Sequence, residues 1–342
     1  MNYWESRRVL ITGGAGFIGQ NLALRLAELG AQVRSVDNLF RDRLGDGRQP
    51  EGIEFLKKDL LDPLQCREAC QGVEVVFHMA SRVGPSSYYA QRPMEVLSCN
   101  LMIDAQVIQA AVASGVRRYF YPSSVFVYPA ERQASPDAPP LQEDEAAPAS
   151  PPLSYGWAKV IGERMVEYAV AENPGFRAAI GRLIGIYGPG QDIDLERGSI
   201  IPVLLRRAYE YPQGEPFCIK GTGRETRSFC YADDAVEAML TSVEALDESP
   251  LIGPINIGCE GRITILDLAR EAVAVSGKEI EIQLAPGETA VWGQSVDCSR
   301  ARSLLDGWTP RISTGEGLRR TYEYVMTRLE QPLARSSEAR RR

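Results

Sequence analysis

The sequence contains a single histidine, and its seven cysteines are scattered along the chain. With only His78, an imidazole relay between two histidines and a histidine-rich metal site are excluded. Cys66 and Cys70 would lie one turn apart on a helix, but no second pair completes a zinc site, so we expect no bound metal. Free thiols in this number fit a reducing compartment, and we expect the protein to be cytoplasmic.

Long apolar runs and clustered positive charge are also missing. No run of apolar residues approaches the length of a membrane span, and the N-terminus shows no basic segment followed by an apolar core. The net charge is −7, and basic residues are dispersed until the last three, Arg340 to Arg342. We therefore expect neither nucleic acid nor a membrane as a partner.

The sequence does contain a glycine-rich turn between a short apolar run and a helical pattern. The run from Val9 to Ile11 leads directly into Gly13, Gly16 and Gly19. In such a turn the first glycine allows the sharp bend, the second lets the backbone approach a pyrophosphate, and the third lets the helix pack on its strand. Because a strand precedes the glycines and a helix comes after them, the spacing predicts a dinucleotide site.

A carboxylate about twenty residues downstream bears on which dinucleotide is bound. The second predicted strand ends at Asp37, whose carboxylate can accept both adenosine ribose hydroxyls and would repel a 2′-phosphate. This favours NAD over NADP. Two alternatives stay open: Arg41 is near enough to hold such a phosphate, and Asp37 is also compatible with a simple turn before Asn38.

Strand-like and helix-like segments alternate through the first half, which predicts a parallel sheet covered on both faces. We expect strands near residues 8–12, 31–37, 53–57, 74–79, 117–123 and 177–184, with helices near 17–29, 63–70, 94–114 and 155–172. Beyond residue 186 the pattern is less regular, with a strand near 216–220 and helices near 199–210, 232–246, 264–276 and 314–329. The predicted fold class is α/β, a Rossmann-type doubly wound parallel sheet with a smaller, partly interleaved C-terminal substrate lobe.

The same pattern sets the expected domain boundaries. Residues 1–186 plus about 229–258 would form the dinucleotide-binding domain, 187–228 plus about 259–330 the substrate-binding lobe, and 331–342 a disordered tail. The segment from Pro129 to Pro152 holds seven prolines and cannot be regular helix or strand. We expect it to be a surface loop near the site.

A tyrosine and a lysine share one face of a predicted helix. Tyr155 and Lys159 are four residues apart, and an ammonium near a phenol lowers the pKa of that phenol. We therefore expect Tyr155 to be an unusually acidic general acid or base. Ser123 and Ser124 end a predicted central strand, at the sheet edge where doubly wound folds bind ligands.

In this order, the motifs resemble the extended short-chain dehydrogenase/reductase superfamily, specifically its nucleotide-sugar epimerase and dehydratase branch. The resemblance runs from about Arg8 to about Leu329. It implies NAD as cofactor, held by Gly13, Gly16, Phe17, Ile18, Gly19, Asp37, Asn38, Asp59, Leu60, Met79, Ala80, Ser81, Asn100, Tyr155 and Lys159. It also implies a nucleotide-diphosphate sugar as substrate, contacted by Arg82, Ser124, Phe126, Gly185 and Arg227, with Ser124, Tyr155 and Lys159 as the catalytic residues.

The family's chemistry begins with hydride removal from C4 of the hexose, and the residues after Ser124 bear on the step that comes next. The resemblance implies an acidic pair there in 4,6-dehydratases and a nearby glutamate in decarboxylases, whereas this sequence has Val125 and Phe126. The similarity is greatest to the GDP-mannose 3,5-epimerase group, but that group's acid–base cysteine falls on Phe126 and its lysine near Ser199 or Ile200. Simple C4 inversion is therefore favoured. A 3,5-epimerase, an NAD(P)-dependent reductase or dehydrogenase, and a non-catalytic dinucleotide sensor remain alternatives.

Two departures from the family pattern concern substrate contacts. Gly185 stands where the resemblance implies an asparagine, and together with bulky Phe126 this suggests a reshaped sugar pocket. Trp292 replaces an arginine that would assist Arg227 on the diphosphate, so Arg206 or Arg207 is a candidate substitute. Family members pair the helices near 94–114 and 155–172 into a four-helix dimer interface, and we expect a homodimer. The alternative is that the protein's own loops cover both helices.

Overall fold

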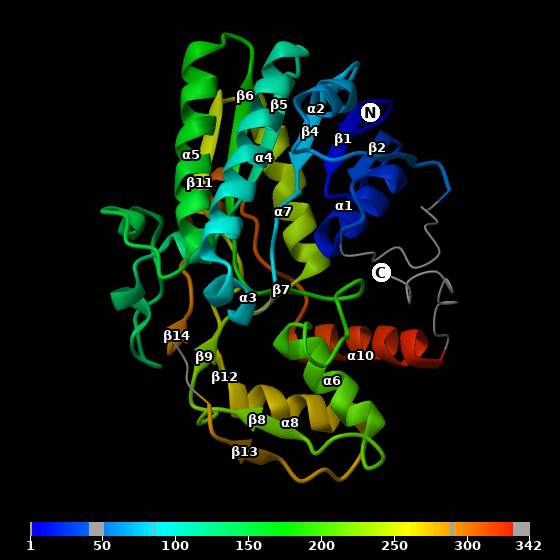
Figure 1. The fold of residues 1–342 in the computed structure, drawn as a ribbon, viewed down its shortest axis with the longest axis vertical. Coiled ribbons are helices and arrows are strands. Elements are labelled where there is room, and N and C mark those ends of the chain that lie inside the picture. The colour runs from blue at the N-terminus through cyan, green and yellow to red at the C-terminus, as the bar shows by residue number, and fades with distance from the viewer. Residues whose placement is uncertain (1, 41–50, 85, 288–290, 331–342) are drawn as a thin grey trace.

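The computed structural model of this chain describes residues 2–40, 51–84, 86–287 and 291–330. Its centre is a seven-stranded sheet in the order β11-β6-β5-β4-β1-β2-β3, and every neighbouring pair in it is parallel (Figure 1). The strands are β1 (Arg8–Thr12), β2 (Gln32–Asp37), β3 (Glu54–Lys57), β4 (Val75–His78), β5 (Arg118–Ser124), β6 (Arg177–Leu183) and β11 (Leu251–Ile257). The order reverses between β1 and β4, which opens a crevice at the carboxyl ends of the strands. The predicted fold class is confirmed.

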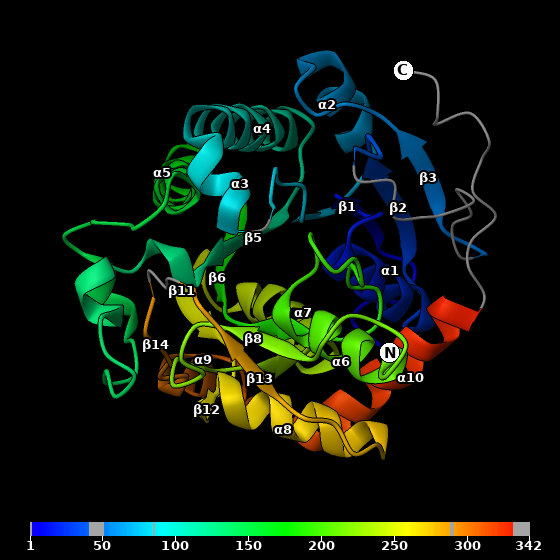
Figure 2. The same cartoon turned by 60° about the horizontal axis from the view of Figure 1, so that its bottom comes forward.

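Helices cover both faces of this sheet (Figure 2). One face carries α1 (Phe17–Glu28) and α7 (Ala232–Glu244), and the other carries α2 (Pro63–Cys70), α4 (Pro93–Ala113) and α5 (Ser154–Glu172). Side chains alternate along each strand, so Val9 and Ile11 pack with α1 and α7, whereas Leu10 packs with the α2–α4–α5 layer. Strands buried on both sides explain why the sequence shows short continuous apolar runs.

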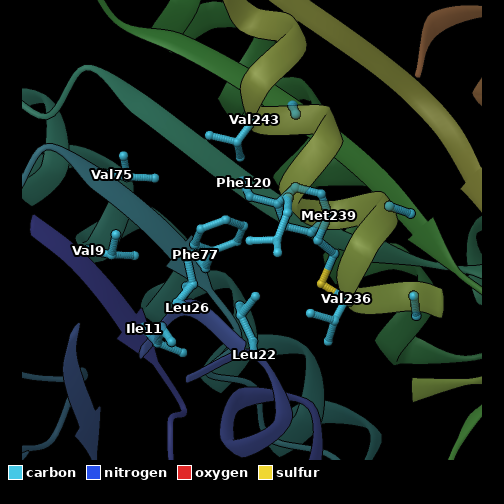
Figure 3. Close-up of a cluster of buried hydrophobic side chains, with 14 of the residues drawn as sticks. Val9, Ile11, Leu22, Leu26, Val75, Phe77, Phe120, Val236, Met239 and Val243 are labelled. Atoms are coloured by element: carbon cyan, nitrogen blue, oxygen red, sulfur yellow. The ribbon is translucent and has the colours of Figure 1, made fainter. Parts of the chain in front are cut away.

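The core between the sheet and the α1–α7 layer is closely packed around aromatic residues (Figure 3). The ring centroids of Phe77 on β4 and Phe120 on β5 are 5.8 Å apart, and Met239 of α7 packs in the same cluster. This core fixes the strand ends from which the site is built.

A smaller part of the chain lies beyond the carboxyl edge of the sheet, in the lower half of Figure 1. Its helices α6 (Ile200–Glu210), α8 (Ile265–Ser276) and α10 (Thr314–Glu330) enclose a separate core that includes Leu204, Leu268 and Leu318. Short elements complete the chain: β7 (Ile186–Tyr187), β8 (Cys218–Lys220), β9 (Thr226–Arg227), β10 (Cys230–Tyr231), β12 (Ile263–Thr264), β13 (Gln283–Ala285), β14 (Gly293–Gln294), α3 (Ser86–Gln91) and α9 (Ser299–Leu304).

The six predicted strands of the sheet and its four predicted helices lie within a residue or two of their expected positions. The seventh strand, β11, was not predicted, because Gly253 and Pro254 interrupt it and are typical of a turn. The structure accommodates them with a register shift against β6 between Ile252 and Ile255. The predicted tail, 331–342, lies outside the described residues.

From the sequence we expect no segment that reaches the length of a membrane span, but helix α4 does. It has 21 residues and is long and apolar enough to cross a membrane by length and composition, with 39% of its most apolar window buried. This is weak evidence for a membrane span, because core helices pass the same test. In this structure Val107 and Ile108 of α4 pack in the core between the sheet and α2 and α5.

The proline-rich segment 129–152 lies between β5 and α5. It contains the short helices η2 (Ala130–Gln133) and η3 (Glu143–Ala146). The Gln133 carbonyl accepts a 2.8 Å hydrogen bond from the Trp292 amide, and Oε1 of buried Glu143 accepts one of 2.8 Å from the Asn256 amide. The segment does not itself line the cleft at the carboxyl edge of the sheet, but it runs between Phe126 and Tyr155, which do. Its position near the site, expected from the sequence, agrees with this.

Candidate active site

A cleft of about 720 Å³ lies at the carboxyl edge of the sheet. The loops after β1, β2, β3 and β4 line one side, and the end of β5 and the first turns of α5 line the other. The segment before α6, including Gln191, Asp192 and Arg197, closes it from the C-terminal part of the chain. The topological switch point therefore carries the site, as in other doubly wound sheets.

The glycine turn forms one wall of this cleft with an open backbone surface. Gly13 has a φ of 63°, and an added Cβ there would lie 2.7 Å from the Ala80 backbone. At Gly19 an added Cβ would lie 2.3 Å from the Gly13 carbonyl oxygen, so only glycine lets α1 pack this closely. At Gly16 the only atom within 4 Å among the described residues would be that same oxygen at 3.1 Å, which leaves its surface free for a ligand.

Helix α1 begins directly after Gly16 with no side chain capping its amides among the described residues. Uncapped amides and the positive end of the helix dipole suit a pyrophosphate. Asp37, at the end of β2, accepts hydrogen bonds from the amides of Ala15 (3.2 Å) and Leu39 (2.8 Å) and lines the same cleft. Arg41, the candidate 2′-phosphate ligand, lies outside the described residues.

Most of the predicted cofactor residues meet in this cleft. Lining residues include Phe17, Ile18, Asn38, Asp59, Leu60, Met79, Ala80 and Ser81. Asn100 does not line it. Its Oδ1 instead accepts hydrogen bonds of 2.7 Å from the Ser81 hydroxyl and from the Arg82 amide. Asn100 therefore positions Ser81 and Arg82, which line the cleft, without lining it itself.

The three predicted catalytic residues also converge here. Ser124 ends β5, and Tyr155 and Lys159 lie one turn apart on α5. Tyr155 packs against two aromatic rings, with centroid distances of 5.5 Å to Tyr89 and 6.3 Å to Phe126.

The Lys159 side chain is almost completely buried, with 1% of its surface exposed, and its ammonium has no hydrogen-bond partner among the described residues. Its Nζ lies 4.5 Å from the centroid of the Tyr121 ring and 5.8 Å from that of Tyr155. An unpartnered buried ammonium that lines the same cleft as the glycine turn is the arrangement that a ligand with hydroxyl acceptors would complete.

The expected acidity of Tyr155 is not found. Burial raises the pKa of the Tyr155 phenol, and a hydrogen bond with Ser81 opposes this increase only in part. Lys159 does not offset it, because the ammonium lies against Tyr121 and burial lowers its own pKa as well. The prediction that the lysine makes this phenol acidic is therefore wrong for the chain without a ligand.

Two predicted substrate residues lie outside the cleft, while Arg82, Ser124 and Phe126 line it. Arg227 donates to the carbonyls of Thr226 (2.8 Å) and Val291 (2.9 Å). Gly185 has a φ of 59°, and a Cβ there would lie 2.0 Å from the Ser228 carbonyl oxygen. Backbone geometry, not a reshaped sugar pocket, accounts for this glycine.

The suggested substitutes for the missing arginine do not reach the cleft either. Arg206 pairs with Glu210 at 2.9 Å, and Arg207 donates to the Cys218 carbonyl at 2.6 Å. The structure instead brings Arg197 and Tyr89 to the cleft, neither of which was predicted. Arg197 lies three residues before the start of α6.

Comparisons with known proteins agree with this geometry. The model of the NAD dependent epimerase/dehydratase family matches residues 9–258. The chain is 30% identical to GDP-mannose 3,5-epimerase of Arabidopsis thaliana, over 98% of this chain and 87% of that protein. It is 28% identical to UDP-glucuronic acid decarboxylase 1 of Danio rerio, over 95% of this chain and 74% of that protein.

The fold is similar to that of UDP-glucose 4-epimerase from Thermotoga maritima, solved with UDP-glucose. The TM-score is 0.80 at 25% identity, covering 94% of this chain and 99% of that one. The glycine turn, the Tyr155–Lys159 pair and these similarities together show that the chain belongs to the NAD dependent epimerase/dehydratase family.

Proposed function

We propose that this protein is an NAD-dependent nucleotide-sugar epimerase that inverts C4 through a transient 4-keto sugar. The observation that carries the proposal is the convergence of Ser124, Tyr155 and Lys159 on one cleft with the glycine turn. A tyrosine, a serine and a lysine beside a nicotinamide suffice for reversible oxidation of an alcohol.

The cleft fits NAD. The open surface at Gly16 and the uncapped start of α1 suit the pyrophosphate, and Asp37 suits the adenosine ribose. The buried ammonium of Lys159 would hold the nicotinamide ribose. When bound, the nicotinamide supplies reversible hydride transfer, which is chemistry that no side chain provides.

The chain's own residues orient the sugar and move its proton. The Ser124 hydroxyl would hold the C4 hydroxyl, and the Tyr155 phenolate would accept its proton and later return it. The rings of Tyr89 and Phe126 pack against Tyr155 and shield it in part from water. Lys159, charged and without another partner among the described residues, would stabilise the phenolate as it forms.

The cleft lacks groups that the competing reactions need. Among the described residues that line it there is no cysteine, histidine or glutamate. Of its carboxylates, Asp37 and Asp59 lie on the cofactor side, and Asp192 precedes α6. This supports hydride chemistry at C4 over deprotonation at C3 and C5 or elimination.

Similarity to GDP-mannose 3,5-epimerase makes that reaction the second candidate. The test begins with mass spectrometry of ligands that co-purify with the protein, followed by turnover of a panel of nucleotide sugars in deuterated water. An inverted C4 without solvent deuterium supports the proposal, and deuterium at C3 or C5 supports the 3,5-epimerase. Dependence on added NAD(P)H would instead indicate a reductase.

A further inference from the structure

A buried polar cluster lies behind Lys159, on the side away from the cleft. It consists of Asp104 on α4, His78 on β4 and Tyr121 on β5, and none of the three has measurable exposure to solvent. None of them lines the cleft. Buried polar groups of this kind are costly unless they are paired, so the cluster requires an explanation.

The hydrogen bonds make Asp104 a carboxylate held by two neutral donors. His78 Nε2 lies 3.0 Å from Asp104 Oδ1, and the Tyr121 hydroxyl donates to Oδ2 at 2.6 Å. On the other side of the imidazole, His78 Nδ1 lies 2.8 Å from the Thr12 hydroxyl. The carboxylate needs a donor, which places the single proton of a neutral imidazole on Nε2. Burial lowers the pKa of His78, in agreement with a neutral ring.

Within the described part of the chain no lysine or arginine pairs with Asp104, and one cation nearby lacks an anion. Lys159 Nζ has no hydrogen-bond partner there and lies 4.5 Å from the centroid of the same Tyr121 ring. The next carboxylate on α5, Glu163, is already neutralised by Arg182 through two hydrogen bonds of 2.9 and 2.8 Å. Asp104 and Lys159 therefore contact the same buried Tyr121, the carboxylate at its hydroxyl and the ammonium at its ring.

A glycine on α5 leaves the space that Tyr121 and Asp104 occupy. Gly162 lies three residues after Lys159 on α5, and a Cβ there would lie 1.8 Å from the Tyr121 hydroxyl oxygen and 2.9 Å from Asp104 Oδ2. Any side chain would displace the hydroxyl from the carboxylate or α5 from the sheet.

We propose that Asp104 is a positioning residue for the reaction: it is the buried counterion that keeps Lys159 protonated at neutral pH. This rests on the proposed function only in taking Lys159 as the lysine of the active site.

The tyrosines around the pair do not supply this charge, and Glu163, which also opposes the decrease in the Lys159 pKa, does so less than Asp104. Burial raises the pKa of Tyr119 and Tyr121 on β5 well above the ordinary value and also raises that of Tyr155, so these phenols are neutral. Burial lowers the pKa of Lys159, and Asp104 is the strongest group opposing that decrease.

The composition of the chain allows a direct test. It has five lysines, at 57, 58, 159, 220 and 278. Protein labelled with ¹³C at the lysine Cε therefore gives few NMR signals. The signal that is missing from a Lys159→Met variant is that of the buried lysine. We expect the titration midpoint of Lys159 to fall by about 1–3 pH units in Asp104→Asn. Tyr119→Phe is the matched control, because that buried phenol beside His78 makes no hydrogen bond to Asp104. It should leave the midpoint in place.

An unchanged midpoint in Asp104→Asn overturns the proposal. If that variant does not fold, the wild-type titration decides: an ammonium at neutral pH supports the proposal, and a neutral amine contradicts it. In turnover, Asp104→Asn should move the alkaline limb of kcat to lower pH by the same amount without changing KM. If no nucleotide sugar is turned over but the midpoint still shifts, the proposed function fails and the role of Asp104 stands.

Discussion

Tyr155 is the residue on which the proposed chemistry depends, and its surroundings keep it protonated until a ligand is bound. Burial raises the pKa of the Tyr155 phenol, and Lys159 lies nearer to the Tyr121 ring than to the Tyr155 ring. Stabilisation of the phenolate therefore has to come from the assembled complex. The residue pair was visible in the sequence, but the direction of the pKa shift depends on burial that only the packed structure provides.

We expect Tyr155→Phe to lower kcat by about 10²–10⁴-fold, the range ascribed to a general acid or base, while NAD content is retained. Turnover of the nucleotide sugar identified from the panel measures this loss. Tyr168→Phe on the same helix is the control, because that ring is 63% exposed and far along α5. Equal activity of the two variants would exclude Tyr155 from the reaction and favour the sensor alternative.

His78 makes a separate prediction, on stability. Burial keeps its folded pKa below the unfolded value of about 6.5, so the unfolded chain binds an extra proton as the pH falls through that value. The stability that His78 contributes is complete above about pH 6.5. Below this it is lost by up to about 1.4 kcal/mol per pH unit.

Urea unfolding of the wild type and of His78→Gln, followed from about pH 7.5 to about pH 5.5, separates this contribution from those of carboxylates. Because the chain has one histidine, the difference in slope belongs to His78 alone. Parallel curves for the two proteins would show that the imidazole titrates normally.

At the scale of elements, the packing of α5 on the sheet depends on one position without a side chain. We expect Gly162→Ala to lower the free energy of unfolding by about 1–3 kcal/mol, because the added methyl overlaps the Tyr121 hydroxyl. Gly315→Ala is the matched control: it lies on α10, an added Cβ meets no described residue within 4 Å, and its stability should stay equal or rise slightly. Chemical denaturation measures the free energy of unfolding of both variants. Equal stability of the two would contradict the close contact between Gly162 and the Tyr121 hydroxyl.

The elements of the sheet were predictable because each is a local pattern, whereas their long-range partners were not. Buried runs such as Val9–Ile11 and the Tyr155–Lys159 spacing indicate strand and helix directly. Strand β11 contains Gly253 and Pro254, so its pairing with β6 is decided by distant packing. Arg227 and Gly185 were placed by family resemblance, and the local backbone directs both away from the cleft.

At the scale of the whole molecule, we propose that two copies associate through the outer faces of α4 and α5, which lie side by side in Figure 2. Large apolar side chains are exposed there: Met94, Met102, Trp157, Ile161 and Tyr168. An exposed set of this kind is typical of an interface.

We also propose a reducing, cytoplasmic setting, which the seven free cysteines fit.

We expect the wild type to sediment as a dimer and Ile161→Arg as a monomer, because a charge in an apolar interface is costly. Leu304→Arg is the control, since Leu304 is similarly exposed, at 42% against 39%, but lies on α9. Analytical ultracentrifugation measures both. A monomeric wild type would rule out this interface.

In the proposed reaction, one hydride leaves C4 and returns to it on the opposite face. A nucleotide sugar carrying deuterium at C4 tests this directly, with the product analysed by NMR and mass spectrometry. The proposed function predicts full retention of the deuterium at an inverted C4, with no label from solvent and no net reduction of NAD. Loss of the C4 deuterium, or exchange of solvent hydrogen into C3 or C5, would contradict it.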